Sequence, residues 1–586
     1  MGIRKAAFVG WLTAAPIALG QITFPPYHVE ITKILHSSDP APGIPGATVV
    51  DLGAQIDGAG KVLIDAYLSG PGITPDNNRV LWYGDQNGLA IVIRKGDPAP
   101  GVSGAFIDEL WEAYVNETGL ISLACYLSGP SIVPGVNARG AFVGTPGNLQ
   151  KLVQAGEPAP FTEPGTVFAS SSTAAIRLTD NGTVFVIYDL AGPAVNTTND
   201  QAIYAWSPGP PQLIWRRGMA APGTDPGVVF AWSEPCCAAF NDLGQFVSRC
   251  GLSGPGVTNQ NDSGYWVLWS GGGQLVAREG FQGPQLPPGV NLFGTAFPGS
   301  NALGEVVFYA TLSGPDVDSE NNSAIWAGNA LAPSLVMRTG DPAPDMMPGI
   351  VIASAYAAGV HPINSRGFVA LYARLSGLGV NSGNDFATYL GPPGGMRLVM
   401  REGDSLPQLG AGINAGFGDA IYALNDVGDL VAVSFLTGAN VTPENDKVCW
   451  VRRRGGWWAP LLRTGDVIDG RTVLAGSLYE FSPIKDCTGG SDAVLQRLND
   501  NGEVVASPLF SDASRGVYVL HGSAAVDGDF DGDLDLQDYE TLPACLAGPL
   551  FASGSPPCSY FDIDFDGDVD LRDLALFQEM FSGNEP

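Results

Sequence analysis

The chain has 586 residues, of which 45% are hydrophobic and only 15% are charged, so it can bury a large core and is not globally disordered. Its 59 acidic residues against 29 basic ones give a formal net charge of −30, which disfavours binding to nucleic acids or anionic membranes. The 78 glycines and 46 prolines are typical of short strands joined by tight turns.

The N-terminus has the pattern of a secretory signal peptide. Arg4 and Lys5 form a short basic region, an apolar stretch follows, and Ala18-Leu19-Gly20 offers a cleavage site between small residues. The alternative is a buried N-terminal strand or helix. No later stretch reaches the about 20 apolar residues that a membrane span needs. We therefore predict that residues 1–20 are removed and that the protein is secreted or displayed at the cell surface.

A glycine-containing motif recurs along the body of the chain. Arg94 to Gly101 reads RKGDPAPG, and degraded copies follow at intervals of about 60 residues, which indicates a tandem array. The repeated glycines are Gly96, Gly156, Gly218, Gly280, Gly340, Gly403 and Gly465. Each unit contains four short runs of alternating apolar residues separated by Gly, Pro and Asn, a pattern that predicts a four-stranded antiparallel sheet.

Four-stranded sheets repeated in this way favour a β-propeller, in which radial packing covers the faces of the sheets. The two ends of the array are incomplete: Glu30–Leu35 supplies only a fourth strand, and the last unit supplies three strands that end at Gly516–Leu520. Together they complete one blade, so residues 27–521 are expected to form a mainly β, eight-bladed propeller of four-stranded repeats. The alternative is an open β-solenoid, which needs a cap at both ends.

The first two strands of a unit are separated by an Asn-x-x-Gly turn, as in Asn116 to Gly119 and Asn301 to Gly304. Over roughly residues 30–520 these units resemble bacterial secreted tandem-repeat proteins with an Asn-x-x-Gly-x-x-Ala-Phe-type motif. The Ala-Phe pair is usually altered here; Asn301 to Gly304, for example, is followed by Glu305-Val-Val-Phe308. The resemblance implies repeats with a variable anchoring tail and no established activity.

The C-terminal tail carries two acidic loops with the spacing of a twelve-residue calcium loop, which places oxygen ligands at positions 1, 3, 5, 9 and 12 and a glycine at position 6. The predicted ligands of two Ca²⁺ ions are Asp527, Asp529, Asp531, Asp535 and Asp538 in the first loop, and Asp562, Asp564, Asp566, Asp570 and Asp573 in the second. Asp533 and Asp568 occupy position 7, which normally contributes its backbone carbonyl, so their side chains add further charge. The alternative is a solvated acidic run. Because the carboxylates repel one another, calcium binding and folding should be coupled.

Aspartate at position 12 and a single short helix after each loop, expected at 536–546 and 571–581, resemble dockerin modules. The resemblance covers about residues 525–584 and implies a small α-helical calcium-binding domain bound by a cohesin-like partner. Such modules attach secreted, mostly polysaccharide-active proteins to a scaffold or a cell surface. Cys545 and Cys558 lie between the loops, where a disulfide could brace them. Other disulfide candidates in an exported chain are Cys236, Cys237, Cys250, Cys449 and Cys487.

The propeller units themselves lack the common catalytic motifs of hydrolases and nucleotide-binding enzymes. An arginine stands two positions before every repeated glycine except Gly156, often with an aspartate after the glycine, as in Arg94 and Asp97. This pattern indicates either a ring of anion or glycan contacts or, more simply, one structural Arg–Asp pair in each blade. The Asn-Asp pairs of the units, such as Asn384-Asp385, are interpreted as Asx-turns rather than ligands.

A functional site should lie where the repeats differ. The second blade alone contains Glu109, Trp111 and Glu112, which offer a carboxylate pair for glycoside chemistry with a sugar-stacking platform; the simpler alternative is a solvated strand edge. Trp457-Trp458 and an insertion at 480–492 are further candidate surfaces.

We therefore predict a secreted, non-catalytic binding or scaffolding propeller without assigned catalytic residues, tethered by its calcium-binding tail, with a glycan as a possible ligand. The alternatives are a polysaccharide-degrading enzyme, either a glycoside hydrolase or a lyase with its site in the propeller channel, and a self-associating surface-layer component.

Overall fold

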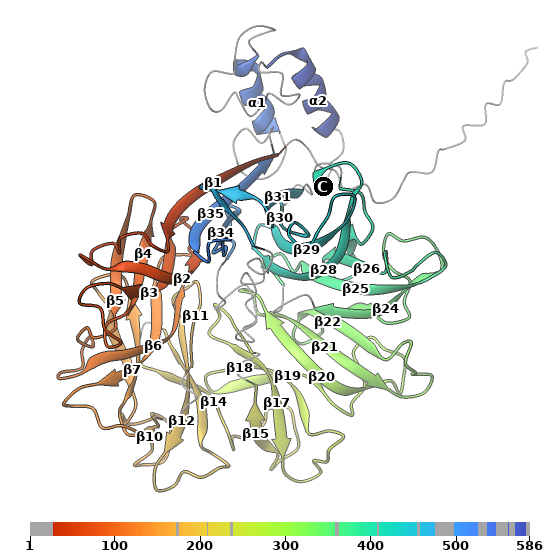
Figure 1. The fold of residues 1–586 in the computed structure, drawn as a ribbon. Helices are drawn as coiled ribbons and strands as arrows, with labels where there is room; N and C mark the ends of the chain where they lie inside the picture. Colours follow the sequence, from red (N-terminus) through yellow and green to blue (C-terminus); the bar gives the residue numbers. More distant parts are fainter. Residues whose placement is uncertain are drawn as a thin grey trace, which may run out of the picture.

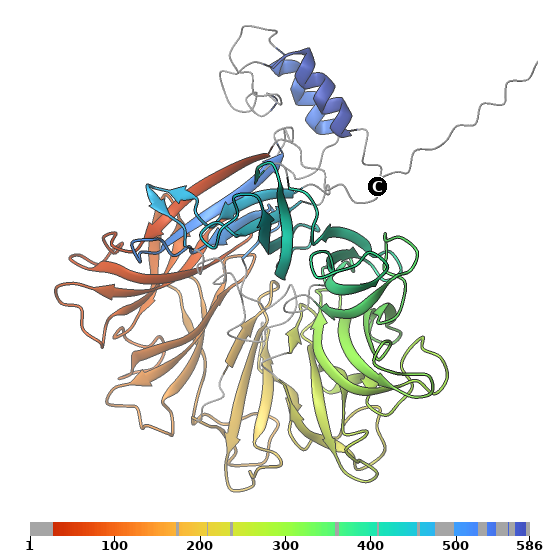
Figure 2. The same ribbon diagram turned by 45° about the vertical axis from the view of Figure 1, so that its right-hand side comes forward.

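The computed structural model describes residues 27–170, 175–207, 209–234, 238–357, 363–406, 409–453, 458–474, 497–524, 536–546, 561 and 569–581. Antiparallel sheets follow one another around a ring (Figure 1). The turned view shows the same succession of sheets around the ring (Figure 2). The mainly β, eight-bladed propeller expected from the repeats is therefore confirmed, and a solenoid is not observed.

The blades are numbered in chain order. Blade 1 contains β2 (Thr48–Ile56), β3 (Val62–Ser69), β4 (Arg79–Asp85) and β5 (Gly88–Arg94), and blade 2 contains β6 (Phe106–Val115), β7 (Ile121–Ser128), β8 (Arg139–Gly144) and β9 (Gln150–Gln154). Blade 3 contains β10 (Val167–Phe168), β11 (Ala175–Leu178), β12 (Val184–Ala191), β13 (Gln201–Trp206) and β14 (Gln212–Arg216). Blade 4 contains β15 (Val229–Ser233), β16 (Ala239–Phe240), β17 (Phe246–Ser253), β18 (Ser263–Trp269) and β19 (Gly272–Arg278). In blades 3 and 4 the first strand is divided, since β10 and β11 both pair with β12, and β15 and β16 both pair with β17.

Blade 5 contains β20 (Asn291–Ser300), β21 (Glu305–Ser313), β22 (Ser323–Asn329) and β23 (Ser334–Arg338). Blade 6 contains β24 (Ile350–Ala357), β25 (Val369–Gly377), β26 (Phe386–Gly391) and β27 (Arg397–Arg401). Blade 7 contains β28 (Ile413–Leu424), β29 (Leu430–Gly438), β30 (Lys447–Arg452) and β31 (Trp458–Arg463). A two-stranded ribbon of β32 (Val467–Ile468) and β33 (Arg471–Thr472) follows. Blade 8 contains β34 (Glu503–Ala506), β35 (Gly516–Ala524) and β1 (Tyr27–His36), in the order β1-β35-β34.

The two ends of the array close the ring in blade 8. β1 pairs antiparallel with β35, so that Ile31 lies opposite Leu520, and β35 pairs in turn with β34. On the inner side of β34, Leu498 forms a bridge to Val504. The N-terminal segment thus supplies the outermost strand of a blade whose other strands are C-terminal. This exchange confirms the closure predicted from the incomplete end units.

The Asn-x-x-Gly turns form a circle of hydrogen bonds between neighbouring blades. Asn301 Nδ2 donates to the carbonyl of Asn364, whose own Nδ2 donates to the carbonyl of Asn425 at 3.0 Å. The circle closes where Asn499 Nδ2 donates to the carbonyl of Asp57, again at 3.0 Å. Because these turns from all eight blades meet around one axis, the first strands that lead into them line the central channel.

The repeated proline motif anchors a buried tryptophan in blades 1, 4 and 5. Trp82, Trp266 and Trp326 are completely buried on the third strands of blades 1, 4 and 5. Each indole N–H donates to a proline carbonyl in the preceding connection, namely Pro42, Pro222 and Pro284 at 2.9–3.0 Å. A buried indole needs such an acceptor. The repeated motif therefore serves packing and polar satisfaction at once.

The repeated arginines are structural, but their partner differs from the one predicted. Arg94 Nε donates to the carbonyl of Asn77 at 2.7 Å, and the equivalent arginines of other blades donate to the asparagine 17 or 18 positions earlier. Asp97 instead accepts the backbone N–H of Arg94 at 2.8 Å. The expected Arg–Asp side-chain pair is thus wrong for Arg94 and Asp97, because the Arg94 side chain bonds the carbonyl of Asn77 while Asp97 accepts a backbone N–H within its own turn.

The Asn-Asp pairs behave as predicted. Asn384 Oδ1 accepts the N–H of Asn381 at 2.8 Å, and its Nδ2 donates to the carbonyl of Gly379 at 3.1 Å. The same two bonds occur at Asn77, Asn261, Asn321 and Asn445. These asparagines hold an Asx-type loop and are not available as ligands.

Helices α1 (Leu536–Cys545) and α2 (Leu571–Phe581) lie outside the ring beside the blade of β1 and β35 (Figures 1 and 2). Their buried residues Leu542 and Phe577 belong to the same apolar cluster as Leu520 of β35. Among the described residues, neither helix has the length and apolar character needed to cross a bilayer.

Two disulfide predictions are wrong. Cys250 on β17 and Cys449 on β30 are free thiols, completely buried in the core, where a thiol packs as a small apolar side chain. Cys236, Cys237 and Cys487 lie outside the described residues. So does Cys558, and its pairing with Cys545 stays a prediction.

Candidate ligand site in the central channel

A cavity of about 200 Å³ opens on the channel side of blades 1 and 2. Its wall is made by the middle of β2, by residues of β3 and β4, and by 111–114 of β6. Arg497, which precedes the ring turn of blade 8, completes the lining. The first strands of three successive blades therefore contribute to one hollow beside the propeller axis.

Trp111 is the aromatic side chain most open to this cavity, with an exposed fraction of 51%. Its ring meets the edge of Tyr126 at a centroid distance of 5.9 Å, and the guanidinium of Arg139 lies 5.9 Å from its centroid. A bulge of β6 between Leu110 and Glu112 sets the local direction of the side chains. An exposed indole that is fixed by contacts with Tyr126 and Arg139 offers an apolar face to a ligand.

Glu109 does not pair with Glu112, contrary to the carboxylate pair considered from the sequence. Glu109 forms ion pairs with Arg79 at 2.7 Å and with Lys95 at 3.1 Å. Burial alone would raise the pKa of Glu109, but the hydrogen bonds and charges of Arg79 and Lys95 outweigh it and lower the pKa below its usual value. A general acid needs a raised pKa, so this carboxylate does not suit that role.

Glu112 points to the next blade. Its Oε2 accepts the N–H of Ile176 at 3.0 Å and pairs with Arg177 at 3.1 Å. The side chains of Glu112 and Arg177 are only 12% and 3% exposed. This buried ion pair connects β6 of blade 2 with β11 of blade 3. The two glutamates thus hold different neighbours, which is why the bulged strand does not bring them together.

Gln55 connects blades 1 and 2 through hydrogen bonds to the backbone of β6. Its Nε2 donates to the carbonyl of Ala113 at 2.7 Å, and its Oε1 accepts the N–H of Val115 at 3.3 Å. Asp65, also at the cavity, is held by two hydrogen bonds from Arg79 at 2.6 and 3.0 Å. The polar lining of the cavity is therefore rigid and already largely paired.

Arg497 is the exception. Burial lowers the pKa of Arg497 to about 10. The residue is surrounded by protein, yet part of its surface stays accessible, as expected for a side chain that faces an internal cavity. Within the described part of the chain, no hydrogen-bond or ion-pair partner of this guanidinium is present.

Arg497 was not predicted from the sequence, although the repeats contain a signal for it. It stands two positions before the asparagine of the blade 8 turn, where the residue varies widely among blades. The corresponding residues are Gln55, Tyr114, Arg177, Ala239, Gly299 and Ala423 in blades 1 to 5 and 7. Comparing that position across the repeats would have singled out the large polar residues of blades 8, 1, 2 and 3.

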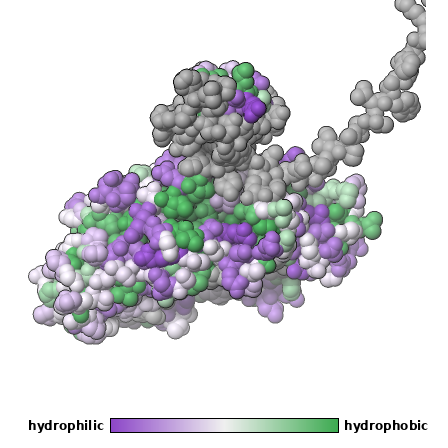
Figure 3. Space-filling view, turned by 45° about the horizontal axis from the view of Figure 1, so that its top comes forward, coloured by the Kyte–Doolittle hydropathy of each residue, from purple (hydrophilic) through white to green (hydrophobic). Residues whose placement is uncertain are grey.

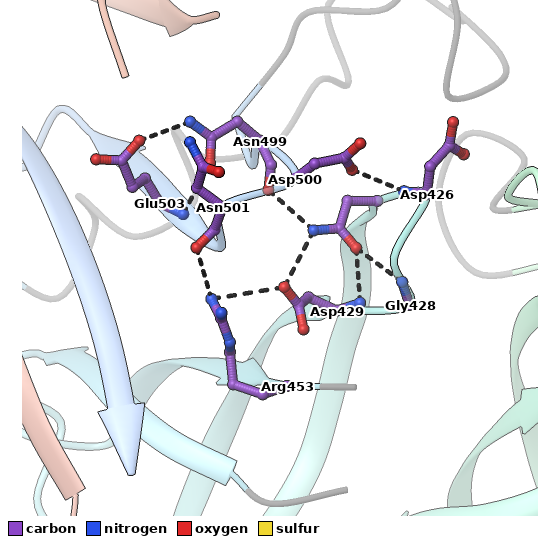
Figure 4. A network of polar contacts seen from close by, with 9 residues as sticks. Asp426, Gly428, Asp429, Arg453, Asn499, Asp500, Asn501 and Glu503 are labelled. Carbon is purple, nitrogen blue, oxygen red and sulfur yellow. Dashed lines mark hydrogen bonds and ion pairs between the residues drawn. The ribbon is translucent and has the colours of Figure 1, made fainter. Parts of the chain in front are cut away.

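The ring of turns also gathers carboxylates, and Figure 4 shows part of this network at blades 7 and 8. Asp426 donates its N–H to Asp500 Oδ1 at 3.0 Å, while the buried Asp429 pairs with Arg453 at 3.5 Å. Burial, followed by the charges of Asp180, Asp500, Asp57 and Asp426, raises the pKa of Glu117 to about 8. Among the described residues, no three His, Cys, Asp or Glu side chains are arranged to hold a metal ion. We interpret these carboxylates as acceptors for the turns of neighbouring blades.

The remaining predicted candidates fall in two groups. Trp458 is 2% exposed and packs edge-on against Trp450, so it belongs to the core and is not a binding surface. Trp457 and the insertion at 480–492 lie outside the described residues, as do residues 1–20. Of the predicted calcium ligands, the structure describes only Asp538, Asp570 and Asp573.

The described calcium-loop residues stand at helix starts. Asp538 and Asp573 are completely buried in the first turns of α1 and α2. Asp573 Oδ2 accepts the N–H of Asp570 at 2.7 Å, and Asp570 Oδ1 accepts the N–H of Arg572 at 2.6 Å. A completely buried carboxylate requires compensation, part of which the N–H of Asp570 supplies to Asp573. Calcium binding by these residues stays a prediction.

The model of a family of unknown function, DUF7453, matches residues 24–135 and 137–526. The chain belongs to this family. The match covers the whole propeller of this DUF7453 protein. A search of curated proteins finds no match.

Solved structures similar to this DUF7453 protein include the β-propeller domain of the Trilobed protease from Pyrococcus furiosus, with 8% identity, a TM-score of 0.33, and 72% of this chain and 100% of that chain covered. The α-L-arabinanase of Penicillium chrysogenum has 12% identity and a TM-score of 0.24, covering 62% and 98%. A PL25 ulvan lyase has 11% identity and a TM-score of 0.28, covering 83% and 94%. Similarities this low give no information about the ligand or activity of this chain.

Figure 3 shows polar and apolar residues interspersed over the side of the propeller that it presents. That mixture is ordinary for a protein surface. The channel cavity is therefore the feature of the described residues that best supports a ligand site.

Proposed function

We propose that the protein is a secreted, non-catalytic binding propeller that holds a small ligand in the channel cavity and is tethered through a calcium-dependent tail. The binding role is supported by how the side chains of the cavity wall are paired and exposed. Glu109 and Glu112 are each held by basic residues of different blades, whereas Trp111 remains open. Fixed carboxylates beside an exposed aromatic face suit recognition better than proton transfer.

The proposed tether is a dockerin-like module with two calcium ions. Its ligands are the aspartates of the loops at 527–538 and 562–573, and its partner is a cohesin-like module or another cell-surface component. The burial of Asp538 and Asp573 at the two helix starts supports this assignment, because these positions close the loops. Secretion is proposed from Arg4, Lys5 and the apolar segment that follows them.

The binding role is tested with a glycan array probed by the full chain, followed by a turnover assay on every glycan that binds. We expect binding without product formation, and loss of binding in Trp111→Ala. Trp269→Ala is the matched control, since Trp269 is 39% exposed at the end of β18 in blade 4. Release of shorter products by the wild type would contradict the non-catalytic role.

The tether is tested by calcium titration of the full chain. We expect two sites, and their loss in the double variant Asp538→Asn/Asp573→Asn. Asp85→Asn, at the end of β4, is a control for nonspecific loss of negative charge. A titration that shows no sites at millimolar calcium would overturn the tether and leave the propeller proposal standing.

A further inference from the structure

One repeated position, two residues before each ring turn, differs in side-chain size and polarity between the two sides of the channel wall. In blades 8, 1, 2 and 3 this position holds Arg497, Gln55, Tyr114 and Arg177. In blades 4, 5 and 7 it holds Ala239, Gly299 and Ala423. Large polar side chains are thus concentrated on the side of the channel where the cavity lies.

The charged groups that line the cavity are Asp65, Glu112 and Arg497. Asp65 is neutralised by the guanidinium of Arg79, and Glu112 by that of Arg177. Arg497 is left as a positive charge for which the described residues supply no counter-charge. A buried charge is costly unless it is paired, so the cavity favours a ligand that carries an anionic group.

A guanidinium selects a planar, two-oxygen anion. Its N–H groups form two parallel hydrogen bonds to a carboxylate, which gives both energy and orientation. On the other part of the wall, Trp111 presents an exposed ring face. Such a face packs against the apolar side of a pyranose ring. The two features require one ligand that has a carboxylate and a flat, partly apolar ring.

The size of the cavity limits the occupant. At about 200 Å³ it is smaller than the ~300 Å³ at which pockets for drug-sized ligands begin. It accommodates one sugar residue rather than an oligosaccharide. Further residues of a chain would extend along the channel.

We propose that the channel cavity binds one carboxylated sugar residue, with the carboxylate on Arg497 and the ring on Trp111. This inference rests on the proposed binding function and names the class of its ligand. Uronic acids, free or within an acidic polysaccharide, have the required chemistry.

The test compares two probes that differ only in the carboxylate, methyl β-D-glucuronide and methyl β-D-glucoside. Binding to the full chain is measured by titration calorimetry and by saturation-transfer NMR. We expect the glucuronide to bind about 10-fold or more tightly than the glucoside, the difference expected for one charge-assisted pair of hydrogen bonds. In Arg497→Leu this difference should disappear.

The matched control is Arg397→Gln, because Arg397 is an exposed arginine of β27 whose ion pair with Asp345 measures 3.4 Å. It should retain the preference for the glucuronide. Thermal unfolding provides a second readout for Arg497→Leu. Removing an unpaired buried charge should leave the Tm unchanged or raise it, whereas a purely structural arginine would lower the Tm.

Three outcomes separate the two proposals. A glucuronide preference that is lost in both Arg497→Leu and Trp111→Ala supports the inference. Equal binding of the two probes, lost in Trp111→Ala, overturns the carboxylate assignment and leaves the binding function intact. No binding of either probe, with a retained glycan-array signal, also overturns the inference, whereas no signal in either experiment overturns both proposals.

Discussion

Two sectors of the channel wall have the same architecture and different chemistry. Blades 4, 5 and 7 and blades 8, 1, 2 and 3 share the ring of turns and the antiparallel blade architecture. They differ in the residue two positions before the turn, which is small at Ala239 and Gly299 but large and polar at Arg497 and Gln55. The repeated residues explain why the chain folds into a ring. The varied ones show where that ring can recognise something.

The largest difference in unfolding free energy should appear between replacing Trp266, a buried tryptophan of a blade core, and replacing Trp111 at the cavity. Trp266→Ala removes a completely buried ring and its hydrogen bond to Pro222, so the free energy of unfolding should fall by about 3–5 kcal/mol. Trp111→Ala should change it by no more than about 1 kcal/mol, because half of that ring is exposed. Denaturant unfolding of both variants checks this. Equal losses would place Trp111 in the core and remove it from the site.

The two glutamates of β6 sharpen the comparison further. Glu112→Ala leaves Arg177 buried without its partner and should cost about 3 kcal/mol of unfolding free energy. Glu109→Ala should cost about 1 kcal/mol or less, since that side chain is 37% exposed and its ion pairs are screened by water. Thermal unfolding of the two variants in parallel measures the difference. A larger loss for Glu109→Ala would contradict the assigned roles.

The carboxylates of the turn ring predict a pH dependence. The pKa of Glu117 is raised to about 8 in the folded protein, so the folded state binds its proton more tightly than the unfolded state. Its contribution therefore weakens stability as the pH rises from the usual glutamate pKa toward 8. Glu117→Gln should raise the Tm at pH 8 and have little effect near pH 4. A gain that is the same at both pH values would contradict the burial argument.

A smaller effect is expected from the ring itself. Asn364→Ala removes the hydrogen bond to the carbonyl of Asn425 and should cost about 1 kcal/mol. Asn381→Ala, in an exposed loop of the same blade, is the matched comparison. Hydrogen exchange at the turn of blade 7 should increase only in the first variant. Equal changes would show that the circle of turns does not couple neighbouring blades.

Much of the fold was predictable because its signals are local and repeated. The spacing of Gly96 and its copies gave the blade length, and the incomplete ends at Glu30–Leu35 and Gly516–Leu520 gave the closure. The partners of the arginines were not predictable, since Arg94 reaches a carbonyl 17 residues away that no pattern marks. The same holds for the site. Trp111 was found because its blade differs from the others, whereas the separation of Glu109 from Glu112 depends on a strand bulge.

The most direct test of the account is a crystal structure of the full chain soaked with methyl β-D-glucuronide. We predict density for one sugar between β2 and β6, with its ring against Trp111 and its carboxylate at Arg497. Density elsewhere on the propeller, or a cavity that contains only water when calorimetry shows binding, would contradict the assignment of the channel as the ligand site.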